Sequence, residues 1–317
     1  MRPHVLELIL IAICMLIVLV RIWRSVRSYP TLTEDDSGLW RYHEDVSFKR
    51  KDPYGPILTG QKQAQKKELR QPVAVIHFNG DMRAKGHRDL AKLVDEIEIN
   101  KDKLHGVVFV VSSPGGFVST YGHAFSQLER IRRLEIDLTV CIDVVAASGG
   151  YLMSLPANRI VAAPFAMVGS VGVVAFVPNF RQLLRNWEIE PRTFTAGKYK
   201  RTVTLTDDAT PEEIARFQSQ LETVHRHFVE LVKQYRPQAK LSEVETGEHW
   251  SAKESMELQL GLVDDLATSQ EYLLRLNHDY PLITLSVKKG LFDDGFMKFS
   301  GAVADEVEER LMRLGSL

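Results

Sequence analysis

The sequence predicts an α/β fold, in which crossover helices connect the strands of a mostly parallel sheet. Apolar runs of strand length alternate along the chain with stretches whose apolar residues recur at helical spacing, which is the pattern of crossover units. Several strand-like runs, such as 105–111 with the sequence HGVVFVV, are apolar almost throughout. A run of this kind indicates a strand that is covered on both faces of the sheet.

The strands and helices are expected to follow one another from residue 73 onward. A helix over 211–236 is supported by Thr210, which suits the N-cap position, and by Pro211 at the first helical position. Another helix is expected to begin at Ser148, directly after a strand. The expected strands are 73–78, 105–111, 138–145, 159–164 and 191–195, and the remaining expected helices are 88–99 and 120–133.

An apolar run near the N-terminus predicts one membrane-spanning helix. Residues 5–23 begin with the sequence VLELILIAICMLIVLV and are long enough to cross the roughly 30 Å core of a bilayer. A cleaved signal peptide is the alternative, but most of the basic residues follow the run, and no small-x-small cleavage site follows it. Three arginines after residue 20 and one before residue 5 slightly favour a cytoplasmic C-terminal side, which leaves the membrane face of the domain open.

The rest of the chain divides by composition. We expect a membrane anchor over 1–27, a polar linker over 28–70, a folded domain over 71–285, and a C-terminal extension with an amphipathic helix over 286–317. A second apolar run over 161–178 is interrupted by glycines and prolines, which favours buried strand and turn over a second membrane span.

Composition argues against several classes of function. The net charge of −1 gives no reason to expect a nucleic-acid partner. The two cysteines, Cys14 and Cys141, lie in the predicted membrane run and in a predicted buried strand, so a disulfide between them is not expected. The sequence contains no Cys-x-x-Cys pair, and therefore no zinc or redox site of that type is expected.

Two glycine-containing turns predict a site for acyl transfer. Ser148 lies at a strand–helix junction and precedes Gly149 and Gly150, where the N–H groups of a helix start can stabilise an anion. The alternative is that Ser148 only caps the helix. The turn 113–116, with the sequence SPGG, ends another strand and can present N–H donors to a developing oxyanion, although an ordinary strand-to-helix turn has the same composition.

A serine nucleophile needs a general base, and the residues alone leave that base open. Histidine is the common choice, but two of the histidines lie in the amphipathic run 211–236, where surface or packing roles are favoured. A lysine acts as a base only if burial or neighbouring donors disfavour its charged form. The candidates are three histidines, two lysines and an aspartate that either orients a histidine or ends its strand: His225, His227, His249, Lys198, Lys200 and Asp143.

Five stretches of the chain form a series of long motifs. They are SPGG (113–116), DVVAASGGYLMS (143–154), APFAMVGSVGVVA (163–175), TAGKYKRTVTL (195–205) and TGEHWSAKESMELQLGLVDDL (246–266). In this order they resemble the signal peptide peptidase A family of serine proteases, and most nearly its SohB branch. The resemblance extends over about 72–270, which is nearly the whole predicted domain.

This resemblance implies a Clp-protease/crotonase-like fold and a Ser–Lys dyad. Ser148 would be the nucleophile and Lys200, the second lysine of the Gly-Lys-Tyr-Lys motif, would be the base. Ser170 would support the lysine through a hydrogen bond, and the backbone N–H groups of Gly116 and Gly149 would hold the oxyanion.

The resemblance also implies a homo-oligomer, in which the serine and the lysine of one site can come from neighbouring subunits. Members of the family cleave peptides with small or apolar side chains, including signal-peptide remnants, and need no metal or nucleotide cofactor. We therefore expect a serine endopeptidase held in a bacterial inner membrane through residues 5–23. Two alternatives stay open: a crotonase-fold acyl-CoA hydratase or isomerase, which would use carboxylates, and a catalytically inactive membrane scaffold.

Overall fold

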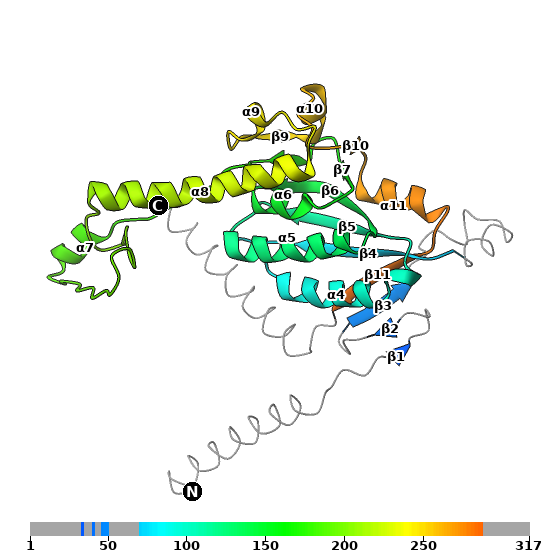
Figure 1. Ribbon diagram of the computed structural model, residues 1–317, viewed down its shortest axis with the longest axis horizontal. Coiled ribbons are helices and arrows are strands. Elements are labelled where there is room, and N and C mark those ends of the chain that lie inside the picture. The colour runs from blue at the N-terminus through cyan, green and yellow to red at the C-terminus, as the bar shows by residue number, and fades with distance from the viewer. Residues whose placement is uncertain (1–32, 35–39, 42–45, 51–69, 288–317) are drawn as a thin grey trace, which may run out of the picture. The chain divides into compact units, whose positions relative to one another are not determined.

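The computed structural model describes residues 33–34, 40–41, 46–50 and 70–287 of the chain (Figure 1). The predicted membrane anchor at 5–23 and nearly all of the predicted C-terminal extension lie outside these residues. Among the helices of the described part, none is both long enough and apolar enough to cross a membrane.

The chain divides into two compact units, one made of residues 1–48 and 287–317 and the other of residues 49–286. In the first unit, β1 (Thr33–Glu34) pairs antiparallel with β2 (Trp40–Arg41). β3 (Val46–Arg50) crosses the sequence boundary between the units. These short strands fall within the stretch that the sequence predicted to be a polar linker.

The second unit is built on a mostly parallel sheet, as the sequence predicted. Across the sheet the strand order is β10-β7-β6-β5-β4-β11, and each neighbouring pair in this order is parallel. A short strand, β8, pairs parallel with the end of β6, and β9 pairs antiparallel with β8. The bounds are β4 Val73–Asn79, β5 Gly106–Ser113, β6 Asp137–Ala147, β7 Arg159–Ala162, β8 Met167–Gly169, β9 His249–Ser251, β10 Asp265–Leu266 and β11 Leu282–Val287.

Helices connect these strands where the sequence predicted crossovers. The predicted helices 88–99, 120–133 and 211–236 agree with α4, α5 and α8 to within about two residues at each end, the usual uncertainty of helix boundaries. The helices are α4 His87–Ile99, η1 Lys101–Lys103, α5 Val118–Arg133, α6 Gly149–Ser154, α7 Arg181–Asn186, α8 Pro211–Tyr235, α9 Leu241–Val244, α10 Ala252–Glu257 and α11 Ser269–Asn277.

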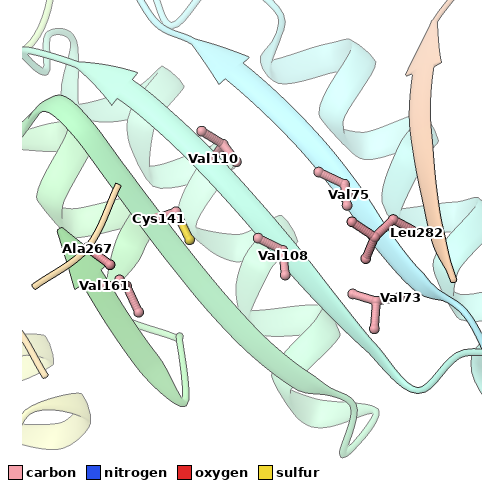
Figure 2. Close-up of a cluster of buried hydrophobic side chains, with 8 residues drawn as sticks. All are labelled: Val73, Val75, Val108, Val110, Cys141, Val161, Ala267 and Leu282. Carbon is pink, nitrogen blue, oxygen red and sulfur yellow. The ribbon is translucent and has the colours of Figure 1, made fainter. Parts of the chain in front are cut away.

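Both faces of the sheet are covered, which accounts for its apolar strands. On one face a cluster of buried side chains packs against residues of α11. Figure 2 shows the members of this cluster, which are Val73, Val75, Val108, Val110, Cys141, Val161, Ala267 and Leu282. Tyr272 of α11 lies against this cluster, and its hydroxyl is 3.1 Å from Oγ1 of Thr139. Because side chains alternate along a strand, Ile76 and Phe109 face the other side, where α4 and α5 lie across the sheet (Figure 1).

α8 has two unlike halves. It begins with a capping box, in which Oγ1 of Thr210 accepts from the N–H of Glu213 at 3.2 Å and the Glu213 carboxylate accepts from the N–H of Thr210 at 2.8 Å. Its buried residues, Phe228 and Val232, both lie in the C-terminal half. Residues 173–210, called the arm below, precede the exposed half, and Figure 1 shows them extending around α7 past the N-terminal end of α8.

The arm departs from the sequence predictions in two places. The predicted strand at 191–195 is wrong, because these residues are all exposed and have no sheet on which to pack. The prediction of buried core over 161–178 is correct for β7, β8 and Val171, but Val174 and Phe176 are 91% and 89% exposed. After Gly172 the chain leaves the sheet, so apolar side chains that read as core lie on the surface.

Candidate active site

Ser148 occupies the junction between β6 and α6 in a backbone conformation that is unusual for a serine. Its φ is +50° and its ψ is −121°, and its N–H donates to the carbonyl of Gly169 at 2.9 Å. The residue is half-buried, and its side chain makes no capping hydrogen bond to α6. Ser148 therefore occupies the N-cap position of α6 without using its hydroxyl to cap the helix, which leaves the hydroxyl available for chemistry.

The two glycines after Ser148 allow the backbone to pack tightly. A Cβ added at Gly149 would lie 2.5 Å from the ring of Tyr121 on α5, and one added at Gly150 would clash with the carbonyl oxygen of Ser113. Neither position can accept a side chain without a shift of the surrounding structure. The start of α6 is consequently held against the ends of β5 and α5.

The turn 113–116 lies beside Ser148, as the sequence predicted. β5 and β6 are neighbours, and Ser113 is paired in register with Ala146. Gly115 has a φ of +91°, and a Cβ added there would lie 2.7 Å from the amide nitrogen of Gly149 and 2.8 Å from Cβ of Ser148. Within the described part of the chain, the N–H groups of Gly116 and Gly149 donate no hydrogen bond, so both are available to an incoming oxygen.

A buried hydrogen-bond chain supports this turn from behind. The phenol of Tyr121 donates to the carbonyl of Asp81 at 2.7 Å and also contacts the hydroxyl of Ser113. The same Ser113 oxygen accepts from the N–H of Gly115 at 3.1 Å. Burial raises the pKa of Tyr121, which keeps the phenol protonated as this chain requires. Sequence reasoning missed Tyr121, and a phenol on the apolar side of a predicted helix was the available signal.

Ser170 also lies close to Ser148. Ala147 at the end of β6 is paired in register with Gly169 at the end of β8. Ser148 and Ser170 are the residues that directly follow this pair. Ser170 is half-buried, has a φ of +53°, and donates its N–H to the carbonyl of Glu248 at 2.6 Å. The structure thus brings the predicted nucleophile, the predicted supporting serine and the predicted oxyanion donors into one place.

The lysines are placed differently. Lys200 is exposed on the arm, and among the described residues its side chain makes neither a hydrogen bond nor an ion pair; its backbone N–H donates to Gly197 at 3.1 Å. Lys198 forms an ion pair with Glu212 at 3.0 Å. The contacts of Lys198 with Tyr199 and Glu212 raise its pKa, which is opposite to what a general base needs. A single chain therefore does not bring either lysine into contact with Ser148.

None of the other candidate catalytic residues contacts the Ser148 hydroxyl among the hydrogen bonds of the described residues. Asp143 accepts from the N–H of Ser269, the first residue of α11, at 2.6 Å, so its carboxylate binds the start of this helix rather than a histidine. His225 contacts the carbonyl of Val171, whereas His227 and His249 are exposed. Burial raises the pKa of Cys141 to about 12, so this thiol is unreactive. Within the ranges that the structure describes, no group of three or more His, Cys, Asp or Glu side chains is arranged to hold a metal ion.

Comparison with known proteins places the chain beside a family of peptidases. The model of peptidase family S49 matches residues 130–282, and the model of the N-terminal region of that family matches residues 56–128. Together the matched ranges contain Ser148, Ser170, Lys200 and both candidate oxyanion glycines.

Individual relatives agree with the family match. The chain is 40% identical over 230 residues to "Probable protease SohB" of Haemophilus influenzae, covering 70% of this chain and 64% of that protein. It is 35% identical over 250 residues to "Probable protease SohB" of Buchnera aphidicola subsp. Acyrthosiphon pisum, covering 78% and 73%. The first match therefore spans slightly less than two thirds of the relative.

A weaker likeness is found among solved structures. The 1510-N membrane protease specific for a stomatin homolog from Pyrococcus horikoshii is 12% identical, and its TM-score is 0.42. The match covers 72% of this chain and 98% of that chain.

Proposed function

Because this chain belongs to peptidase family S49, we propose that it is a membrane-anchored serine endopeptidase that uses Ser148 as nucleophile and Lys200 as general base. One observation carries the proposal most directly. The Ser148 hydroxyl lies at a strained strand–helix junction, beside the unengaged N–H groups of Gly116 and Gly149. An uncommitted hydroxyl in the same region as free backbone donors supports a site for acyl transfer.

In this mechanism, neutral Lys200 takes the proton of the Ser148 hydroxyl as its oxygen attacks the peptide carbonyl. The carbonyl oxygen becomes an oxyanion and accepts hydrogen bonds from Gly116 and Gly149. Lys200 then returns the proton to the leaving amine, and the acyl group stays on Ser148 as an ester. A water molecule then gives a proton to the same lysine and attacks the ester carbonyl. As the acyl–oxygen bond breaks, the carboxylic acid product leaves and the lysine returns the proton to the Ser148 oxygen. Ser170 holds the lysine amine in the orientation that both transfers need.

The lysine of each site is proposed to come from a neighbouring copy of the chain. The arm exposes apolar side chains, including Phe176 at 89% and Phe194 at 91%, and also carries Lys200. Large apolar side chains that are exposed together on a surface often mark a site of protein interaction. Packing the arm against a second copy would cover these side chains and remove the lysine amine from water, which favours its neutral form.

The rival acyl-CoA chemistry is less well supported by the same region. A hydratase or isomerase would need a free carboxylate near the oxyanion donors. Oδ1 of Asp81 accepts from the backbone N–H groups of Arg83 and Lys85 at 2.9 and 3.0 Å, and Asp143 accepts from the N–H of Ser269. Both of these carboxylates therefore already accept hydrogen bonds from the backbone of the same chain.

Two further features belong to the proposal. Residues 5–23 anchor the enzyme in a bacterial inner membrane, and the substrates are peptides with small or apolar side chains, such as signal-peptide remnants. Deletion of residues 1–30 should release the chain from membranes in alkaline carbonate. Continued membrane association of the deletion variant would contradict the anchor.

The catalytic assignment is tested with the full-length chain in detergent and a set of apolar peptides. We expect Ser148→Ala and Lys200→Ala each to lower kcat/KM by at least about 10⁴-fold, since losses of about 10⁴- to 10⁶-fold in kcat follow removal of one member of a catalytic unit. The matched control is Lys198→Ala, which removes a lysine of the same exposed arm and should leave kcat/KM nearly unchanged. Wild-type turnover by Ser148→Ala, or a loss confined to the Lys198 variant, would contradict the dyad.

A further inference from the structure

The turn that carries Ser170 is held by contacts from three separate elements. Ser148 donates its N–H to the carbonyl of Gly169 at 2.9 Å, and the N–H of Ser170 reaches the carbonyl of Glu248 at 2.6 Å. The third contact comes from α8, where Nε2 of His225 lies 3.1 Å from the carbonyl oxygen of Val171. These contacts fix three consecutive residues beside the candidate nucleophile.

The chemistry of the third contact defines the state of the histidine. A carbonyl oxygen only accepts hydrogen bonds, so Nε2 of His225 must carry the hydrogen and donate it. Val171 is fully buried, and losing this donor would leave its carbonyl without that partner. The sequence pattern predicted only a surface or packing role for His225, and the structure shows a specific polar contact.

The position of His225 on α8 ties this contact to the rest of the domain. His225, Phe228, Val232 and Arg236 recur at helical spacing and form the stripe by which the C-terminal half of α8 meets the domain. Arg236 closes the other end of the stripe through bonds of 2.7 and 2.8 Å to the carboxylate of Asp264. His225 is the member of the stripe that touches the active-site turn.

We propose that His225 is a positioning residue for the peptidase reaction, acting through the Val171 carbonyl to fix the orientation of Ser170. The inference rests on the proposed function. Ser170 has a φ of +53°, a conformation that persists only where its surroundings determine it. The same turn also supplies the Gly169 carbonyl that holds the backbone of Ser148, so a shift in the turn reaches both serines.

The proposal makes a specific kinetic prediction. His225→Leu keeps an apolar side chain on the stripe but removes the donor, and should lower kcat by about 10-fold to 100-fold, the range that a small misplacement of catalytic groups can cost. KM should change little, because the substitution removes no group that is proposed to contact the substrate. His225→Gln places an amide N–H near the position of Nε2 and should restore most of kcat.

The test measures kcat and KM of the full-length chain in detergent on an apolar peptide. The variants are Ser148→Ala, His225→Leu, His225→Gln, Ser170→Ala, the double variant of His225→Leu with Ser170→Ala, and the control His227→Leu. His227 is the exposed histidine two residues along the same helix. We expect His227→Leu to match wild type, and the double variant to lose no more than the more damaging single variant.

Several outcomes would overturn the inference. One such outcome is a wild-type kcat in His225→Leu. Another is a loss of kcat in His225→Gln or in His227→Leu that equals the loss in His225→Leu. Effects of His225→Leu and Ser170→Ala that simply multiply would show that the histidine does not act through the Ser170 turn. If wild type turns over no faster than Ser148→Ala, the proposed function itself fails, and that result is distinguishable from the others.

Discussion

The turn beside Ser148 and the arm that carries Lys200 both contain a glycine in the left-handed backbone region, and the two glycines differ in their surroundings. Gly115 has a φ of +91°, and a Cβ there would lie within 2.8 Å of three neighbouring atoms. Gly197 has a φ of +99°, and a Cβ there would meet nothing within 4 Å. The proposed nucleophile is thus held next to the sheet, whereas the proposed base lies on an exposed part of the arm.

The same contrast holds for ion pairs. Arg236 is 3% exposed and binds Asp264 through two hydrogen bonds, which link the end of α8 to the segment before β10. Lys198 and Glu212 are each 69% exposed at the border between the arm and α8. The first pair is part of the folded core, and the second is a solvated surface contact.

The largest effect is expected from the matched glycine substitutions. Gly115→Ala combines an unfavourable φ with overpacking and should lower the free energy of unfolding by about 2 to 4 kcal/mol. It should also lower kcat by about 100-fold, because the added methyl group displaces an oxyanion donor. Gly197→Ala meets only the conformational cost, and its exposed turn can relax. Denaturant unfolding and peptide hydrolysis check both, and equal losses for the two variants would contradict the contrast.

Breaking the buried ion pair should destabilise the protein more than breaking the exposed ion pair. Asp264→Asn leaves a buried guanidinium without its charged partner and should lower the free energy of unfolding by about 3 kcal/mol, the low end for a broken buried pair. Glu212→Gln, at the exposed pair, should leave stability unchanged. Thermal unfolding of both variants is the measurement, and a large loss in Glu212→Gln would show that the arm is more tightly packed than its exposure indicates.

The pH dependence of stability follows from the same aspartate. Burial alone raises the pKa of Asp264, but hydrogen bonds from Arg236 and from the N–H of Ile160 outweigh burial, so its pKa is lowered on folding. A group with a lowered folded pKa stabilises the protein above its unfolded pKa of about 4 and loses that contribution as the pH falls through the folded value. The stability difference between wild type and Asp264→Asn should therefore narrow below about pH 4.

Polar substitutions of the exposed phenylalanines on the arm should weaken assembly with little effect on stability. Phe176→Ser and Phe194→Ser replace side chains that are already exposed, so thermal unfolding of the domain should change little. Both should reduce the oligomer size in light scattering, and activity should fall with it. Phe165→Ser is the matched control, because Phe165 is 84% exposed but lies outside the arm. If both arm variants kept the wild-type oligomer size, the proposal that the arm forms the contact between copies would be contradicted.

The sequence predicted the structural features that depend on residues close together in the chain. Apolar strands such as β5, and the Thr210 cap of α8, follow from patterns within a few residues. The neighbourhood of Ser113 and Ser148 also followed, since parallel strands that are consecutive in the chain bring their carboxyl ends to one edge. The predicted strand at 191–195 failed because strand formation depends on a neighbouring strand, and the exposed arm provides none.

Contacts between residues far apart in the sequence could not be predicted in the same way. The chain from Asp81 through Tyr121 to Ser113 joins a loop, a helix and a strand end, and no local pattern encodes the pairing. The sequence allows two interpretations of Asp143, and its hydrogen bond with Ser269 of α11 decides between them. The role of Lys200 is a further case, since its proposed surroundings belong to another copy of the chain.

The central claim, that one working site combines Ser148 of one copy with Lys200 of another, is tested most directly by co-expressing Ser148→Ala and Lys200→Ala chains. Each variant alone should be inactive. Mixed oligomers should recover about a quarter of the wild-type rate, because random mixing places an intact serine beside an intact lysine of the neighbouring copy at that frequency. No recovery in oligomers that demonstrably contain both variants would show that the dyad forms within one chain, and would contradict the account.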